Sequence, residues 1–271
     1  MKHTSKLILT LLFSAMVWPQ QISAQEQNVT VPDNTQYILT PPAPATPRIN
    51  SARVFGVRPK SEFRYTIAAT GNRPMTFSAD GLPKGLKLDE QTGIITGRLK
   101  KKGTYKVVLR AKNSLGEAER DLRIEVGEDI LLTPPMGWNS WNCWGKSVSQ
   151  EKVLSSAKAM VDKGLANYGY TYINIDDGWQ GIRGGKHNAI QPNRKFQDIK
   201  GLVDELHGMG LKAGIYSAPW VATYQGHVGT QCDNPDGKYE WIEKGLCDEN
   251  YKLEDPDGKL HSGYFRYHGA Y

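Results

Sequence analysis

Hydrophobic and polar residues alternate with a period of two along much of the stretch from residue 48 to residue 127. Phe63, Tyr65 and Ile67 are separated by polar residues, and residues 122–126 repeat the pattern. Asp-Gly and Thr-Gly pairs separate these runs, and no helical spacing of apolar residues interrupts them. Short strands with alternating faces and tight turns are typical of a β-sandwich. The stretch is therefore predicted to form an all-β domain.

After residue 127 the pattern changes to strands that alternate with amphipathic helices. The predicted elements are strands at 136–138, 170–175 and 211–216 and helices at 153–165 and 202–206. Ser147 and Gln150 predict a capping box before the first helix, and Gly210 is expected to end the second. Strand–helix–strand order predicts right-handed crossovers and a parallel sheet, which could be an open doubly wound sheet or a closed barrel.

The first residues have the pattern of a secretory signal peptide. A basic start precedes an apolar run at 7–18 and small residues at 22–24. That run is too short to span a bilayer, so residues 1–24 are expected to be cleaved, leaving a secreted or periplasmic protein with no membrane association. Residues 25–47 are polar and then rich in proline, which predicts an exposed linker.

Charge and cysteine content exclude several function classes. The chain of 271 residues has a net charge of +6, with 34 Lys and Arg against 28 Asp and Glu. The one dense basic cluster, Lys100-Lys101-Lys102, precedes Gly103 and predicts a turn, so no nucleic-acid partner is expected. Three cysteines, at 143, 232 and 247, show no zinc-site spacing and leave at least one without an intrachain partner.

Polar and aromatic residues follow each predicted strand of the second region. These segments are Trp138-Asn139-Ser140-Trp141, Asp176-Asp177-Gly178-Trp179 and Tyr216-Ser217. The carboxyl ends of parallel strands are where ligands bind. Carboxylates accept hydrogen bonds from sugar hydroxyls, and aromatic rings pack on the apolar face of a sugar. A sugar site is one interpretation; the Asp pair could instead cap a turn and the Trp residues could belong to the core.

Three motifs in this region resemble glycoside hydrolase family 27, the α-galactosidase family. They are TPPMGWNSWN at 133–142, YINIDDGW at 172–179 and GLKAGIYS at 210–217, in the order of the family's first three strands. Residues 81–113, with GLPKGLKLD and TGIITG, resemble immunoglobulin-like domains of secreted bacterial proteins. The resemblances imply an immunoglobulin-like sandwich at 48–127, interpreted as a spacer or accessory module rather than a ligand-binding domain. They also imply the N-terminal part, about three βα units, of a (β/α)8 TIM barrel at 128–271.

The family resemblance also implies an activity and roles for four residues. The activity is retaining hydrolysis of terminal α-D-galactosyl residues in an oligosaccharide or polysaccharide, with no metal or organic cofactor. By position, Asp176 and Asp177 would hold galactose hydroxyls, Trp141 would form a wall of the subsite, and Tyr216 would line its floor. Gly178 stands where the family often has a disulfide-bonded Cys.

No catalytic residue is assigned within the 271 residues. Retaining hydrolysis needs two carboxylates about 5–5.5 Å apart, and the family's Lys-Tyr-Asp nucleophile motif does not occur in the sequence. Nucleophile and acid/base are expected beyond Tyr271, so the chain alone is predicted to be an inactive fragment whose partial barrel leaves an apolar face uncovered. Alternatives are an α-N-acetylgalactosaminidase, a β-L-arabinopyranosidase, or a secreted non-catalytic carbohydrate-binding protein.

Overall fold

A computed structural model describes most of the chain from residue 40 to residue 218. The described residues are 37, 40–184, 186, 189–218, 223–225 and 227, with the backbone of 248–254 and 260–264. The predicted signal peptide at 1–24, most of the predicted linker at 25–47, Cys232 and Cys247 lie outside them. No helix within the described residues has the length and apolar character needed to cross a membrane.

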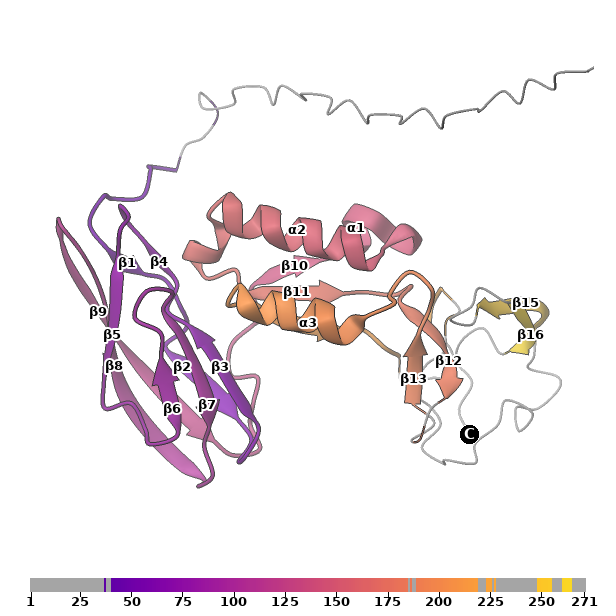
Figure 1. Ribbon diagram of the computed structural model, residues 1–271, viewed down its shortest axis with the longest axis horizontal. Coiled ribbons are helices and arrows are strands. Elements are labelled where there is room, and N and C mark those ends of the chain that lie inside the picture. The colour runs from indigo at the N-terminus through magenta and orange to yellow at the C-terminus, as the bar shows by residue number, and fades with distance from the viewer. Residues whose placement is uncertain are drawn as a thin grey trace, which may run out of the picture. The chain divides into compact units, whose positions relative to one another are not determined.

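The first region is a β-sandwich of two main sheets (Figure 1). Its strands are β1 Arg48–Ile49, β2 Val54–Val57, β3 Glu62–Thr66, β4 Ala69–Thr70, β5 Thr76–Asp80, β6 Leu86–Leu88, β7 Ile94–Arg98, β8 Gly103–Asn113 and β9 Gly116–Val126. One sheet has the order β2-β9-β8-β5 and the other β3-β7-β6, while β1 pairs with β4. All pairings are antiparallel except that of β2 with β9, which is parallel.

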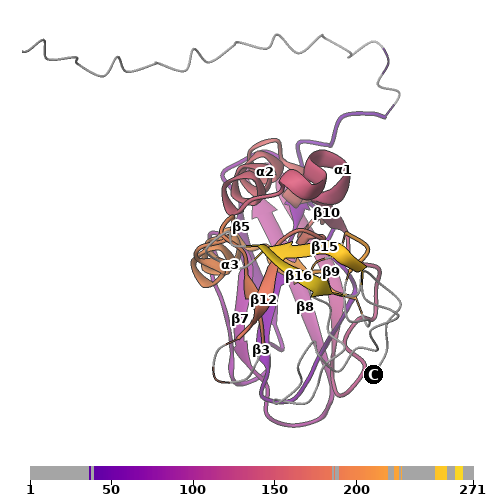
Figure 2. The same ribbon diagram turned by 90° about the vertical axis from the view of Figure 1, so that its right-hand side faces the viewer.

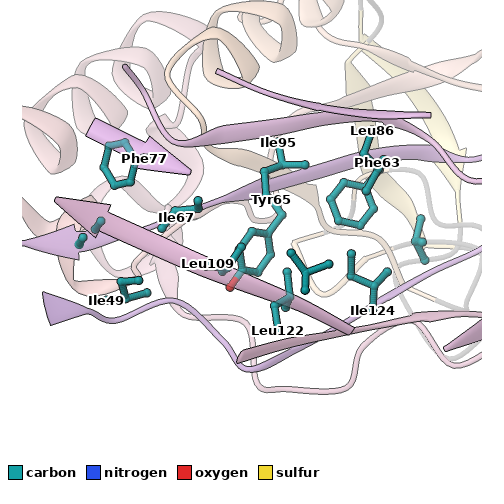
Figure 3. Packing of buried hydrophobic residues seen from close by; sticks show 14 of the residues in the cluster. Ile49, Phe63, Tyr65, Ile67, Phe77, Leu86, Ile95, Leu109, Leu122 and Ile124 are labelled. Atoms are coloured by element: carbon teal, nitrogen blue, oxygen red, sulfur yellow. The ribbon is translucent and has the colours of Figure 1, made fainter. Parts of the chain in front are cut away.

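The core of the sandwich is built from the apolar positions of the alternating pattern. Figure 3 shows side chains of both sheets meeting between them, with Phe63 and Tyr65 of β3 facing Leu109 and Ile124 of β8 and β9. Phe63, Leu109 and Ile124 are fully buried. The alternation of the sequence therefore predicted both the fold class and the buried face.

The second region begins a parallel sheet. Its strands are β10 Gly137–Asn139, β11 Tyr172–Ile175 and β14 Lys212–Ile215, and its helices are α1 Trp141–Trp144, α2 Gln150–Asp162 and α3 Ile199–Gly208, with single 3-10 turns at Gly145–Ser147 and Leu165–Tyr168. The sheet order is β10-β11-β14, parallel throughout. After α3, Gly210 has φ of +77° and both bonds of a Schellman motif form, from Gly210 to His207 and from Leu211 to Leu206. The predicted βα order and the role of Gly210 are thus confirmed.

Two local features differ from expectation. The capping box with Ser147 is wrong: Ser149 is the N-cap of α2 and its hydroxyl accepts from the Lys152 amide. The side chain of Gln150 instead accepts from the amide of Asp198, the N-cap of α3, and so links the starts of the two helices. An antiparallel hairpin of β12 Gln180–Gly184 and β13 Ala189–Pro192 follows β11 and was not predicted. Farther along, β15 Asp248–Glu254 pairs with β16 Leu260–Tyr264.

The apolar face of the parallel sheet is covered by its helices. Ile173 and Ile175 are at most 1% exposed and pack in one cluster with residues of α2 and α3. Figures 1 and 2 show these two helices beside each other along the sheet, and they are in contact. The opposite face carries Tyr172, Asn174 and Lys212. On the helix-covered face the apolar cover is incomplete at the edge strand, because Ile215 at the end of β14 pairs in register with Ile175 but is 53% exposed.

Candidate functional site

The carboxyl ends of β10, β11 and β14 lie side by side. Strand register pairs Asn139 with Asn174, and backbone bonds continue past the strands, from the Ser140 amide to Asn174 (3.0 Å) and from the Tyr216 amide to Ile175 (2.8 Å). The predicted residues that follow each strand therefore share one edge of the sheet.

Asp176 is held by three short contacts at this edge. The Asn139 side-chain amide donates to its Oδ2 at 2.8 Å, and the Asp177 amide donates to its Oδ1 at 2.7 Å. Its own amide donates to the hydroxyl of Ser140, a fully buried residue, at 2.9 Å. Asp176 itself is only half-buried. Its carboxylate is therefore fixed in orientation and still open to further hydrogen-bond donors.

Asp177 differs from its neighbour because it is buried and engaged by a distant segment. It is 3% exposed. Its Oδ1 accepts from the Thr223 hydroxyl at 2.7 Å and its Oδ2 from the Gln225 amide at 3.0 Å. Asp177 thus ties residues 223–225 to the end of β11.

His227 extends this contact. Its amide donates to Thr223 Oγ1 at 3.0 Å, and its ring Nδ1 lies 3.2 Å from the carbonyl oxygen of Gln180. Burial lowers the pKa of His227, and the negative charge of Asp177 opposes that effect. The sequence reasoning missed Thr223, Gln225 and His227, because they lie where no motif was recognised.

Tyr216 lies close enough to the Asp pair for the two carboxylate charges to act on its phenol. Partial desolvation raises the pKa of its phenol, and the charges of Asp177 and Asp176 raise it further. The hydroxyl therefore stays protonated at neutral pH and can donate a hydrogen bond. Its backbone carbonyl accepts from Trp179 Nε1 at 2.8 Å. Asp176, Asp177 and Tyr216 thus lie in one neighbourhood.

Trp141 is connected to the same group through its backbone. Its amide donates to the side chain of Asn139 at 2.8 Å, so that Asn139 bridges Asp176 and the start of α1. Trp141 is half-buried. Trp179 is 7% exposed and belongs to the core, so of the two aromatics only Trp141 offers a surface.

Gly178 allows the chain to turn after the Asp pair. Its φ is +106°, a conformation that favours glycine over any residue with a side chain. The side-chain amide of Asn193, the residue after β13, stabilises this turn by donating to the carbonyls of Gly178 (2.8 Å) and Gln180 (3.2 Å). The unpredicted hairpin of β12 and β13 therefore helps to fix the turn that follows the Asp pair.

The described residues contain no cluster of three or more His, Cys, Asp or Glu side chains that could hold a metal ion. Cys143 is exposed and forms no disulfide within this described part. What the geometry offers chemically is a set of hydrogen-bond acceptors and one neutral phenol, which suits a polyhydroxylated ligand.

Two family models match the chain. "Alpha galactosidase A" matches residues 133–246 and "Putative Ig domain" matches residues 45–127. An alpha-galactosidase of Coffea arabica is 48% identical over 106 residues, covering 38% of this chain and 28% of the relative. Crystal structures of two Bacteroides fragilis proteins, described as a "putative alpha-galactosidase" and a "putative alpha-galactosidase/melibiase", are 43% and 45% identical with TM-scores of 0.67 and 0.66.

The Bacteroides structures cover 72% and 70% of this chain, and the chain covers 42% and 41% of theirs. The chain spans less than a third of the length of the curated alpha-galactosidases it matches. The sequence motifs, the parallel βα units and these matches all indicate the same two domain types in the same order. Residues 133–246 therefore match part of an alpha-galactosidase domain, and residues 45–127, which precede them, match an immunoglobulin-like domain.

Proposed function

We propose that this chain provides the galactose-binding edge of a secreted α-galactosidase that hydrolyses terminal α-D-galactosyl residues with retention. One observation carries the proposal: the ends of three adjacent parallel strands bring an accessible carboxylate, a buried carboxylate and a protonated phenol together. The family matches supply the substrate class.

Each residue has a role that follows from its surroundings. Asp176 accepts from two galactose hydroxyls in charge-assisted hydrogen bonds, held in place by Asn139. Tyr216 donates its phenolic proton, and the ring of Trp141 packs on the C–H face of the sugar. Asp177 binds with its remaining lone pairs while Thr223 keeps it in position.

The bond-breaking step needs groups other than these. In a retaining mechanism one carboxylate attacks the anomeric carbon while a protonated carboxylic acid donates its proton to the leaving oxygen. The resulting second carboxylate then takes a proton from water, which attacks the anomeric carbon and releases the first carboxylate. Asp176 and Asp177 are committed to ligand hydroxyls and to Thr223 and Gln225. We therefore propose that the chain by itself binds galactose without turnover.

Calorimetric titration with D-galactose and release of nitrophenol from 4-nitrophenyl α-D-galactoside test the two parts. Asp176→Asn is expected to weaken galactose binding roughly tenfold to a hundredfold, because hydrogen bonds to a charged group contribute about 1.5–3 kcal/mol. Asp162→Asn, at the exposed end of α2, is the matched control. Equal affinity of both variants contradicts the site, and robust nitrophenol release contradicts the absence of turnover.

Two finer points of the proposal have their own tests. N-acetylgalactosamine and L-arabinose, titrated beside galactose, separate the related activities by the ligand that binds best. Export is tested by the amino-terminal sequence of the mature protein, which is expected to start near residue 25.

A further inference from the structure

The sandwich makes hydrogen bonds to the end of α3. Arg64 of β3 donates from Nη1 to the carbonyl of His207 at 2.9 Å, and the Thr66 hydroxyl donates to the carbonyl of Gly210 at 2.7 Å. The last carbonyls of a helix lack partners within it and carry partial negative charge. The His207 carbonyl already accepts from the Gly210 amide, so the guanidinium from the other domain is a second donor that places positive charge at this helix end and stabilises it.

A second set of bonds reaches the turn before β11. The Asn50 side chain donates to the carbonyl of Asn167 at 2.9 Å, and Arg73 donates to the Asn167 side chain at 2.8 Å. Gly169 has φ of +96°, and a Cβ there would lie 3.2 Å from the carbonyl oxygen of Asn50. The backbones of the two domains thus approach closely at a glycine.

Between these two sets lies the start of β14. The ammonium of Lys212 stands 4.0 Å from the ring centre of Phe55 in β2 and 4.9 Å from that of Tyr172 in β11. A cavity of about 370 Å³, lined by residues of both domains that include Tyr65 and Tyr168, lies next to it. One aromatic ring from each domain therefore contacts the same side chain.

All of these contacts lie at the amino-terminal edge of the parallel sheet. Tyr172 and Lys212 are the first residues of their strands. His207 lies in the last turn of α3, and Asn167 lies in the 3-10 turn that precedes β11. The candidate sugar site lies at the opposite, carboxyl-terminal edge. In barrels of this type the amino-terminal face serves stability and the other face serves chemistry.

We propose that the immunoglobulin-like sandwich is a structural part of the hydrolase domain, whose docking surface (Asn50, Phe55, Arg64, Thr66 and Arg73) holds the amino-terminal edge of the parallel sheet. It is thus neither a flexible spacer nor a module that presents substrate. The Bacteroides structures support this, because the share of the chain that they cover exceeds what residues 128–271 alone could supply. The inference does not depend on the ligand of the sugar site.

The tryptophans provide a selective reporter for the test. Residues 48–127 contain no Trp, and apart from Trp18 every Trp lies at position 138 or later. In the full chain with Trp18→Phe, fluorescence during urea unfolding therefore reports on the hydrolase part alone. Arg64→Ala and Thr66→Val change only the sandwich side of the interface. Arg98→Ala is the matched control, because Arg98 donates to the carbonyl of Lys60 within the sandwich.

Arg64→Ala is expected to lower the folding equilibrium constant reported by Trp roughly tenfold to a hundredfold, and Thr66→Val roughly fivefold. Arg98→Ala is expected to leave it unchanged. Hydrogen exchange of β8 and β9, followed in the same variants, checks that the sandwich stays folded. A Trp transition unaffected by both interface variants would overturn the inference, as would loss of protection in β8 and β9, since the residues would then act within the sandwich.

Discussion

Replacing Lys212 by Met is expected to stabilise the hydrolase part at neutral pH. Burial without an acidic partner among the described residues lowers the pKa of Lys212 from 10.5 to about 8. One pKa unit corresponds to about 1.4 kcal/mol, so holding the ammonium in this place costs about 3 kcal/mol. The contacts with Phe55 and Tyr172 offset part of that cost, since each cation–π contact contributes about 0.5–2 kcal/mol.

The pH dependence of this effect has a definite sign. Below pH 8 Lys212 is protonated in both the folded and the unfolded chain, so the full cost is present. Between pH 8 and 10.5 the unfolded chain still binds the proton that the folded chain has lost, and the free energy of unfolding therefore rises with pH. Above pH 10.5 both forms are neutral and the cost is gone.

Urea unfolding followed by Trp fluorescence at pH 7, 9 and 10.5 measures the effect. Methionine keeps the length and apolar stem of lysine, so Lys212→Met is expected to raise the free energy of unfolding by about 1–3 kcal/mol at pH 7. That gain is expected to shrink toward zero at pH 10.5. Lys158→Met, exposed on α2, is the control for loss of a surface charge. A gain that is independent of pH, or a loss of stability at pH 7, would refute the reasoning.

Three further predictions concern the frame of the site. Asp198→Ala removes the N-cap of α3, whose Oδ1 accepts from the Gly201 amide at 2.8 Å, and is expected to cost about 0.5–2 kcal/mol in urea unfolding; an unchanged midpoint contradicts this. Phe196→Ala empties a fully buried position and is expected to cost about 3–5 kcal/mol by Trp fluorescence, whereas a loss below 1 kcal/mol argues against a packed core. Asn139→Ala frees Asp176 from its donor and is expected to weaken galactose binding about tenfold by calorimetry, with unchanged affinity as the opposing result.

Period-two patterning was enough to predict the sandwich, because each strand has one buried and one solvated face. In β3, Phe63 and Tyr65 are buried between polar neighbours, so the sequence pattern alone indicates which face of the strand packs into the core. The hairpin of β12 and β13 escaped prediction for a physical reason. Its strands are short, contain Gly181 and Gly184, and are supported by side-chain bonds from Asn193 rather than by an alternating apolar face.

The meeting of the strand ends could also be predicted, since parallel strands align their carboxyl ends. What the sequence could not show is the difference between the two aspartates. Asp177 is buried because Thr223 and Gln225, 46 and 48 residues away, supply its donors. Nothing in the local pattern of an Asp pair distinguishes the accessible carboxylate from the one that a distant loop engages.

The parallel sheet explains why docking and sugar binding need not interfere. One face carries Ile173 and Ile175 under the helices, so the remaining positions of the same strands face the other way. Along that second face Asn174 lies over Gly214, where a Cβ would come 2.1 Å from the Asn174 side-chain oxygen. Lys212 stands before this pair and Asp176 after it. The sandwich contacts thus lie at the amino-terminal end of the strands and the proposed sugar site at their carboxyl-terminal end, and a substitution at one end should affect the other only through Asn174 and its neighbours.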